Sequence, residues 1–155
     1  MPKTQTSIKN EVYFKIAHID DFYLINKIER ELKLQLTTLR EMNLILNNNF
    51  SFLWKILLKK ELIGFIQLNG DAIESEIIGM GIKKKFQRLG VGKKAIKFLM
   101  NKGFKNIFLE VSEKNYKALN FYLFMGFKMI EIRHDYYKIN KEIPEDAIIL
   151  NLKKI

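Results

Sequence analysis

The sequence predicts a single α/β domain, residues 1–155, in which helices flank a mixed, central, twisted sheet. Two observations favour this class. Stretches of alternating apolar residues, typical of strands, are interspersed with stretches whose apolar residues recur every three or four positions, as on one face of a helix. The two prolines, Pro2 and Pro144, leave the middle of the chain uninterrupted, and 155 residues suffice for one domain with a buried core. The element order read from these patterns is β-α-α-β-β-β-α-β-α-β-β.

The first half of the chain combines strands with two helices. Asp20 or Asp21 can cap the first helix, and the run NNN ends the second. Two apolar stretches separated by KKE predict a β-hairpin. The expected elements cover residues 12–17, 21–32, 38–46, 50–58, 61–68 and 75–82.

The second half alternates helices and strands. Gly103 supplies a left-handed end to one helix, and Asn115 caps another that stops at Gly126. The last two strands are expected to pair in an antiparallel manner. The expected elements cover residues 91–102, 106–111, 115–126, 127–132 and 146–152.

Composition excludes several classes of function. The chain has no cysteine, which excludes disulfides, zinc–thiolate sites and a cysteine nucleophile. No apolar run approaches the length of a membrane span, and the start of the chain lacks the apolar core of a secretory signal. The acidic and histidine residues form no cluster that suggests a metal. We therefore expect a cytoplasmic protein without a membrane or metal partner.

The positive charge is concentrated in one block. The formal net charge is +10, and residues 77–109 hold nine Lys or Arg residues with no Asp or Glu. Such a block predicts an anionic partner. Three interpretations are open: a nucleic-acid patch, a phosphate cradle, or an ordinary turn beside a solvated basic face.

Within this block, Gly90 and Gly92 lie just before a predicted helix. The outward-pointing N–H groups of a helix's first turn, and its dipole, favour a bound anion, and glycine allows close backbone approach. Flanking Arg88 and Lys93 can add charged contacts. GVGKKA lacks the Ser or Thr of a Walker loop, and the third glycine of a dinucleotide fingerprint is missing.

A longer string narrows the choice. FQRLGVGKKAI resembles the acetyl-coenzyme A signature of the GNAT superfamily of N-acetyltransferases. LEVSEKNYKALNFYLFMGF and IRHDYYKINKEIPEDAIILNL are similar to the later part of its RimI-like branch, which acetylates the N-terminal alanine of a ribosomal protein. The strong similarity covers about residues 76–152. The family's usual Pro-Trp-Ser-type segment after the first helix is not visible, and KLQLTTLREMN stands roughly in its place.

The resemblance implies a GNAT-like fold and acetyl-coenzyme A as the acetyl donor. It implies that backbone at the end of one strand runs along the pantetheine arm, and that the glycine turn cradles the pyrophosphate. Asn115 matches the family's cofactor-contacting asparagine, and it can serve as a helix cap as well. The implied donor-binding residues are Met80, Gly81, Ile82, Gln87, Arg88, Leu89, Gly90, Val91, Gly92, Lys93 and Asn115.

The resemblance also implies catalytic and acceptor-binding residues. Glu110 matches the general base of the branch, and Tyr122 matches the proton donor for the departing thiolate. Tyr136 and Tyr137, in the hairpin between the last two strands, match its peptide-binding region. Each has a plainer interpretation: a strand-end carboxylate facing water, a core aromatic, and cross-strand packing. With no cysteine, direct transfer without an acetyl-cysteine intermediate is expected.

Three functions remain open from the sequence. The first is a RimI-like acetyltransferase acting on a protein N-terminus, such as that of a ribosomal protein. The second is a member of the same family that acetylates a small-molecule amine or amino sugar. The third is a basic ribosome- or RNA-binding module without catalysis. Direct nucleic-acid binding is not expected, because the basic block interleaves few aromatic residues.

Overall fold

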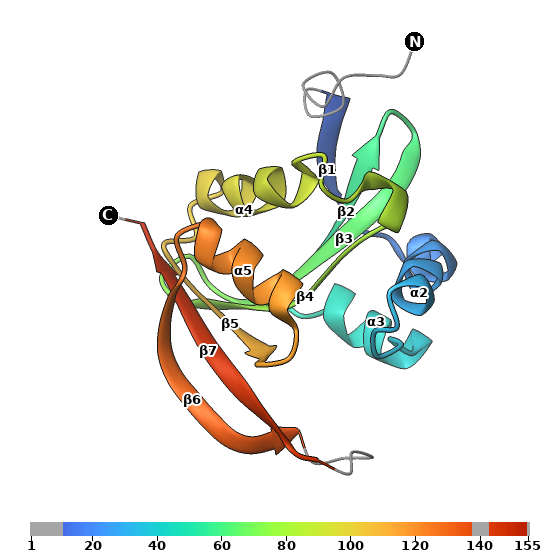
Figure 1. Ribbon diagram of the computed structural model, residues 1–155. Helices are drawn as coiled ribbons and strands as arrows, with labels where there is room; N and C mark the ends of the chain where they lie inside the picture. The colour runs from blue at the N-terminus through green and yellow to red at the C-terminus, as the bar shows by residue number, and fades with distance from the viewer. Residues whose placement is uncertain (1–10, 138–142, 155) are drawn as a thin grey trace. The chain divides into compact units, whose positions relative to one another are not determined.

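The computed structural model of the chain describes residues 11–137 and 143–154 (Figure 1). Among these residues, the predicted order of helices and strands is confirmed, with two short 3-10 helices added. The elements are β1 (Val12–Ile16), η1 (Ile19–Asp21), α2 (Phe22–Glu31), α3 (Leu39–Leu46), β2 (Ser51–Leu58), β3 (Glu61–Gly70), β4 (Ser75–Ile82), η2 (Lys84–Phe86), α4 (Val91–Asn101), β5 (Asn106–Ser112), α5 (Tyr116–Phe124), β6 (Lys128–Tyr137) and β7 (Glu145–Lys153).

The strands form a seven-stranded mixed sheet in the order β1-β2-β3-β4-β5-β7-β6, as the fold class predicted. β4 and β5 are parallel, with Ser75 opposite Ile107, whereas β6 and β7 are antiparallel. Contacts among the described residues divide the chain into two compact units. The first comprises residues up to Asn69 and Ile78–Leu99; the second comprises Gly70–Ile77 and residues from Met100 onward.

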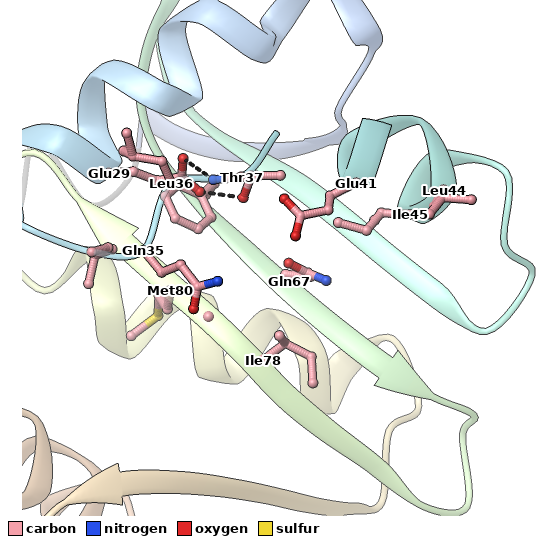
Figure 2. A pocket seen from close by; sticks show the side chains of 13 residues that line it. Glu29, Gln35, Leu36, Thr37, Glu41, Leu44, Ile45, Gln67, Ile78 and Met80 are labelled. Atoms are coloured by element: carbon pink, nitrogen blue, oxygen red, sulfur yellow. Dashed lines mark hydrogen bonds between the residues drawn. The ribbon is translucent and has the colours of Figure 1, made fainter. Parts of the chain in front are cut away.

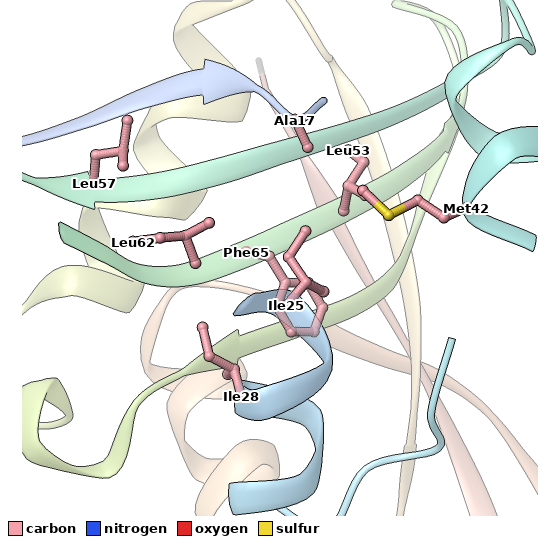
Figure 3. Close-up of a cluster of buried hydrophobic side chains, with 8 residues drawn as sticks. All are labelled: Ala17, Ile25, Ile28, Met42, Leu53, Leu57, Leu62 and Phe65. Atoms are coloured by element: carbon pink, nitrogen blue, oxygen red, sulfur yellow. The ribbon is translucent and has the colours of Figure 1, made fainter. Parts of the chain in front are cut away.

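Helices cover both faces of the strands in the first unit. α2 and α3 bury apolar side chains against one face of β2 and β3 (Figure 3). On the other face, Phe98 of α4 stacks on Phe14 of β1 with ring centroids 4.2 Å apart and meets Trp54 of β2 edge-on. The buried cluster beneath α2 and α3 contains Ala17, Ile25, Ile28, Met42, Leu53, Leu57, Leu62 and Phe65.

A β-bulge in the hairpin shapes this cluster. Ile56 lies opposite Gly64, but Leu57 lies opposite Leu62, so one extra residue is inserted in β3. Side chains alternate between faces along a regular strand, so residues three apart would point to opposite sides. Because of the bulge, Leu62 and Phe65 both face α2 and α3.

The start of α2 differs from the prediction that Asp20 or Asp21 caps it. Asp21 occupies the N-cap position without a side-chain cap hydrogen bond. Its carboxylate instead accepts from Lys55 Nζ at 2.8 and 2.9 Å and from the His18 N–H at 2.7 Å. Lys55 lies 34 positions away in the chain, so the local sequence pattern could not reveal this contact.

The second unit pairs β5, β7 and β6, with α5 packed on one face. Gly126, which ends α5 at a φ of 96°, lies beside Leu152 of β7. β6 reaches Tyr137, although the sequence predicted its end near Ile132. Irregular pairing at Met129/Glu131 and again before Tyr137 breaks the two-residue alternation that reveals a strand.

Within the described residues, no helix is long and apolar enough to span a membrane.

The two glycines of β4 should differ in their tolerance of a methyl group. A Cβ on Gly81 would lie 2.7 Å from the buried Phe65 ring, whereas one on Gly79 would lie 3.8 Å from it. We expect Gly81→Ala to lower the free energy of unfolding by about 1–3 kcal/mol, the usual cost of overpacking. Gly79→Ala should change it by less than about 0.5 kcal/mol. Urea unfolding of both variants measures this; equal stabilities would contradict the Phe65 contact.

Candidate active site

The residues assigned to the donor, apart from Asn115, follow one another in the first unit. Met80, Gly81 and Ile82 end β4, and η2 leads to the turn before α4. The Gln87 side-chain amide donates to the Ile82 carbonyl at 2.8 Å, which ties the turn back to the end of the strand. The strand end and the glycine turn are therefore one connected feature.

The turn before α4 contains two residues with positive φ. Arg88 and Gly90 both lie in the left-handed region, with φ of 62° and 83°. Left-handed residues in a turn can direct backbone N–H groups into a concavity that favours an anion. α4 begins at Val91, and the N–H groups of a helix's first turn have no acceptor within the helix. Leu89, Gly92 and Lys93 complete this stretch, so the predicted phosphate-binding residues fit a pyrophosphate.

Part of the basic block is engaged in contacts inside the first unit. Lys83 and Lys85 each lie 3.1 Å from the Glu61 carboxylate, and the hydrogen bond from Lys85 is the main cause of the lowered Glu61 pKa. Lys94 Nζ donates to the Val12 carbonyl, and burial lowers the pKa of Lys94. Arg88 lies in the turn and Lys93 in the first turn of α4, close to the helix start.

Glu110 of β5 lies in a small polar network of the second unit. Its Oε1 accepts from the Tyr137 hydroxyl at 2.9 Å, and its Oε2 lies 3.5 Å from Arg133 Nη1. The Glu110 side chain is 19% exposed, so it is neither an ordinary surface carboxylate nor fully buried. Glu110 and Tyr137 are brought together by the β5-β7-β6 order.

The sequence predicts Tyr136 and Tyr137 in the hairpin between the last two strands. In the structure they are the last two residues of β6. Their rings meet edge-on with centroids 5.2 Å apart, and Tyr136 is half exposed. Burial, followed by the hydrogen bond to Glu110, raises the pKa of Tyr137. Its hydroxyl therefore remains a donor to Glu110 at ordinary pH. The neighbouring residues 138–142 of the motif lie outside the described part of the chain.

Tyr122 of α5 is buried beside two aromatic rings. It packs against Phe127 and Phe121, with ring centroids 5.3 and 5.1 Å away, and is 8% exposed. Burial raises the pKa of Tyr122 to about 12. The hydroxyl thus stays protonated at physiological pH, which suits a proton donor and excludes a base.

Asn115 is exposed and caps α5 by accepting from the Ala118 N–H at 3.3 Å.

A pocket of about 510 Å³ in the first unit was missed by the sequence reasoning (Figure 2). It extends from α2 and α3 to β4, where Ile78, Gly79 and Met80 line it. The sequence signal for this pocket is the stretch KLQL between the two predicted helices, part of the segment that departs from the family pattern. The lining residues are Glu29, Leu34, Gln35, Leu36, Thr37, Glu41, Leu44, Ile45, Phe65, Gln67, Ile78, Gly79 and Met80.

The predicted site residues divide between the units. Those from Met80 to Lys93 belong to the first unit, together with the pocket. Glu110, Asn115, Tyr122, Tyr136 and Tyr137 belong to the second. Within the described residues, no group of three or more His, Cys, Asp or Glu side chains could hold a metal ion.

Known proteins resemble this chain in sequence and in fold. Residues 14–127 match the acetyltransferase (GNAT) family. N-alpha-acetyltransferase 50 of Danio rerio is 35% identical over 79 residues, which are 48% of this chain and 46% of the relative. The ribosomal protein bS18-alanine N-acetyltransferase of Haemophilus ducreyi is 31% identical over 83 residues, 51% of this chain and 57% of the relative. The chain therefore matches about half the length of these relatives.

The fold is also shared with an acetyltransferase of another acceptor class. The spermidine/spermine N-acetyltransferase SpeG of Vibrio cholerae superposes with a TM-score of 0.77 at 17% identity, covering 94% of both chains. At this identity the likeness concerns the fold alone.

Replacing Gly90 should impair donor binding. A β-branched residue is strained at a φ of 83°, so Gly90→Val should distort the turn and fill the space left for the anion. We expect the dissociation constant for acetyl-coenzyme A to rise at least about tenfold, or about 1.4 kcal/mol. Isothermal titration calorimetry measures it.

Gly103→Val is the matched control. Gly103 has a φ of 100° and open space around its Cβ position, so the same strain arises away from the turn. Gly103→Val should bind acetyl-coenzyme A with wild-type affinity. If both variants lose affinity equally, the glycine turn is not the site that binds the pyrophosphate.

Proposed function

Because the chain belongs to the acetyltransferase (GNAT) family, we propose that it moves an acetyl group from acetyl-coenzyme A to the α-amine of a protein N-terminus. The relatives named for N-terminal and ribosomal-protein acetylation support this acceptor class. The observation that carries the proposal is the pocket, which borders the donor strand at Met80 and has an apolar majority among its lining side chains.

The pocket lining favours the first side chain of a peptide over a polyamine. Leu34, Leu36, Leu44, Ile45, Phe65, Ile78 and Met80 supply the apolar lining. Of its two carboxylates, Glu29 is buried and accepts from Asn26 and Thr37, and only Glu41, which accepts from the Thr38 N–H at 2.6 Å, is exposed. A linear polycation would need several carboxylates available to its ammonium groups, whereas an apolar side chain gains from burial here.

On the donor side, acetyl-coenzyme A supplies the acetyl thioester. The turn from Gln87 to Lys93 would hold its pyrophosphate through backbone N–H groups and through Arg88 and Lys93. The β4 backbone at Met80, Gly81 and Ile82 would run beside the pantetheine arm, and Asn115 would contact the donor while capping α5.

Two residues of the second unit would handle protons. Glu110 would take a proton from the ammonium form of the acceptor, directly or through water. An α-amine with a reference pKa of about 7.8 is already roughly a tenth neutral at pH 7, so the demand on this base is modest. Tyr122, held protonated by burial, would give its proton to the departing thiolate.

Intact mass measurement tests the function. Peptides beginning with Met, Leu, Ala or Asp should gain one acetyl group on incubation with acetyl-coenzyme A, with the large apolar first residues fastest. N-terminally blocked peptides are the control, and spermidine is the competing acceptor. If spermidine is acetylated faster than every peptide, the acceptor is a small-molecule amine and not a protein N-terminus.

Glu110→Gln should lower turnover most at low pH, where neutral amine is scarce. The defect should shrink as pH approaches the pKa of the amine, because less proton removal is then needed. General acid–base assistance is typically worth about 10²–10⁴-fold, so a pH–rate profile on a peptide with a free α-amine measures the defect readily. A profile that matches the wild type at every pH would return Glu110 to a structural role.

Tyr122→Phe should give a defect of a different shape. It removes the proton offered to sulfur without changing the ionisation of the amine, so its defect should persist at pH 9. Coenzyme A affinity, as a control, should change little, because Tyr122 is not assigned to the phosphates. Recovery of wild-type turnover at high pH would exclude the proton-donor role.

A further inference from the structure

Glu29 of α2 is a carboxylate buried at the edge of the pocket, with 3% of the residue exposed. Its Oε2 accepts from Asn26 Nδ2 at 2.7 Å and from the Thr37 N–H at 3.0 Å. Its Oε1 accepts from the Thr37 hydroxyl at 2.6 Å. Figure 2 shows these bonds reaching from Glu29 to Thr37. A buried carboxylate is costly unless it is hydrogen-bonded, so Glu29 constrains the position of Thr37.

Further bonds join the same two segments. Asn26 Nδ2 also donates to the Thr37 carbonyl at 3.0 Å, so both backbone polar groups and the hydroxyl of Thr37 are bound to α2. The Leu34 N–H donates to the Glu29 carbonyl at 2.8 Å. We call residues 34–37 the strap, since hydrogen bonds to α2 hold it at each end.

The strap forms one wall of the pocket. Leu34, Gln35, Leu36 and Thr37 all line it, with Ile78, Gly79 and Met80 of β4 among the other lining residues. Leu34 and Leu36 are 40% and 41% exposed, so core packing restrains them only partly. The hydrogen bonds to α2 therefore carry much of the constraint on where this wall lies.

We propose that Glu29 is a positioning residue that fixes the strap through Thr37 and thereby sets the shape of the acceptor pocket and its affinity for the acceptor. The proposal rests on the proposed function of the pocket. It differs from a direct role, in which the charge of Glu29 would bind an ammonium group of the acceptor. The engaged oxygens and the low exposure of Glu29 favour positioning.

The conservative variant separates the two roles. In Glu29→Gln, the amide oxygen can accept from Asn26 and from the Thr37 N–H, and the amide nitrogen can donate to the Thr37 hydroxyl, which can also accept. Glu29→Gln should therefore keep the KM for the peptide acceptor within about threefold of wild type. Glu29→Ala removes the acceptors and should raise that KM about tenfold or more, with the KM for acetyl-coenzyme A unchanged.

Thr37 provides a milder matched pair. Thr37→Val removes the hydroxyl with little change of shape and should raise the acceptor KM several-fold, while Thr37→Ser should not. Thermal unfolding and coenzyme A affinity show whether Glu29→Ala folds. If it does not fold, the comparison of Thr37→Val with Thr37→Ser tests the positioning role instead. Because Thr37→Val and Glu29→Ala act on one contact, their effects should be less than additive in the double variant.

Hydrogen–deuterium exchange tests the strap without relying on activity. Exchange within residues 33–38 should be faster in Glu29→Ala and Thr37→Val than in wild type, and near wild type in Glu29→Gln and Thr37→Ser.

Three results would overturn the proposal: equal acceptor KM in Glu29→Gln and Glu29→Ala, an unchanged KM in Thr37→Val, or unchanged exchange of the strap. If the wild-type protein acetylates no peptide, the proposed function is wrong. The hydrogen–deuterium exchange experiment would still test whether Glu29 holds the strap in place.

Discussion

The contact between the Phe65 ring and the β4 backbone at Gly81 connects the principal features of the first unit. Phe65 belongs to the buried cluster under α2 and α3, lines the pocket and leaves room at Gly81 for no more than a hydrogen atom. A bulge in the hairpin is what directs the ring to this face. Core, pocket wall and the predicted donor strand thus depend on one aromatic side chain, so changes at Phe65 should affect all three together.

The charges are arranged more specifically than the net value of +10 suggests. Glu61 engages Lys83 and Lys85, and Lys94 turns to the β1 backbone, so part of the basic block has a structural role. The left-handed conformation of Arg88 and Gly90 places the turn's backbone beside a helix start, where an anion is favoured. Backbone geometry therefore supports the phosphate cradle at least as strongly as the lysine count.

Acceptor choice is the variable part of this fold. An N-terminal acetyltransferase relative and a polyamine acetyltransferase structure both resemble the chain, so the fold alone does not select the acceptor. Here the pocket wall is a short strap held by Glu29 and Thr37. A buried carboxylate bound to loop backbone is a compact way to fix such a wall, because moving the loop would leave a buried charge without its donors.

The sequence by itself determined the order of elements, the glycine turn, the cap at Asn115 and the family, because these depend on local periodicity and on short contiguous motifs. It did not reveal the length of β6, where bulges break the alternation, or the role of Asp21, whose carboxylate binds a lysine 34 positions away. Only the tertiary structure placed Tyr137 on Glu110 and closed the pocket around Glu29 and Met80. These contacts join residues distant in the chain, and no local pattern encodes which distant side chain will complete a hydrogen bond.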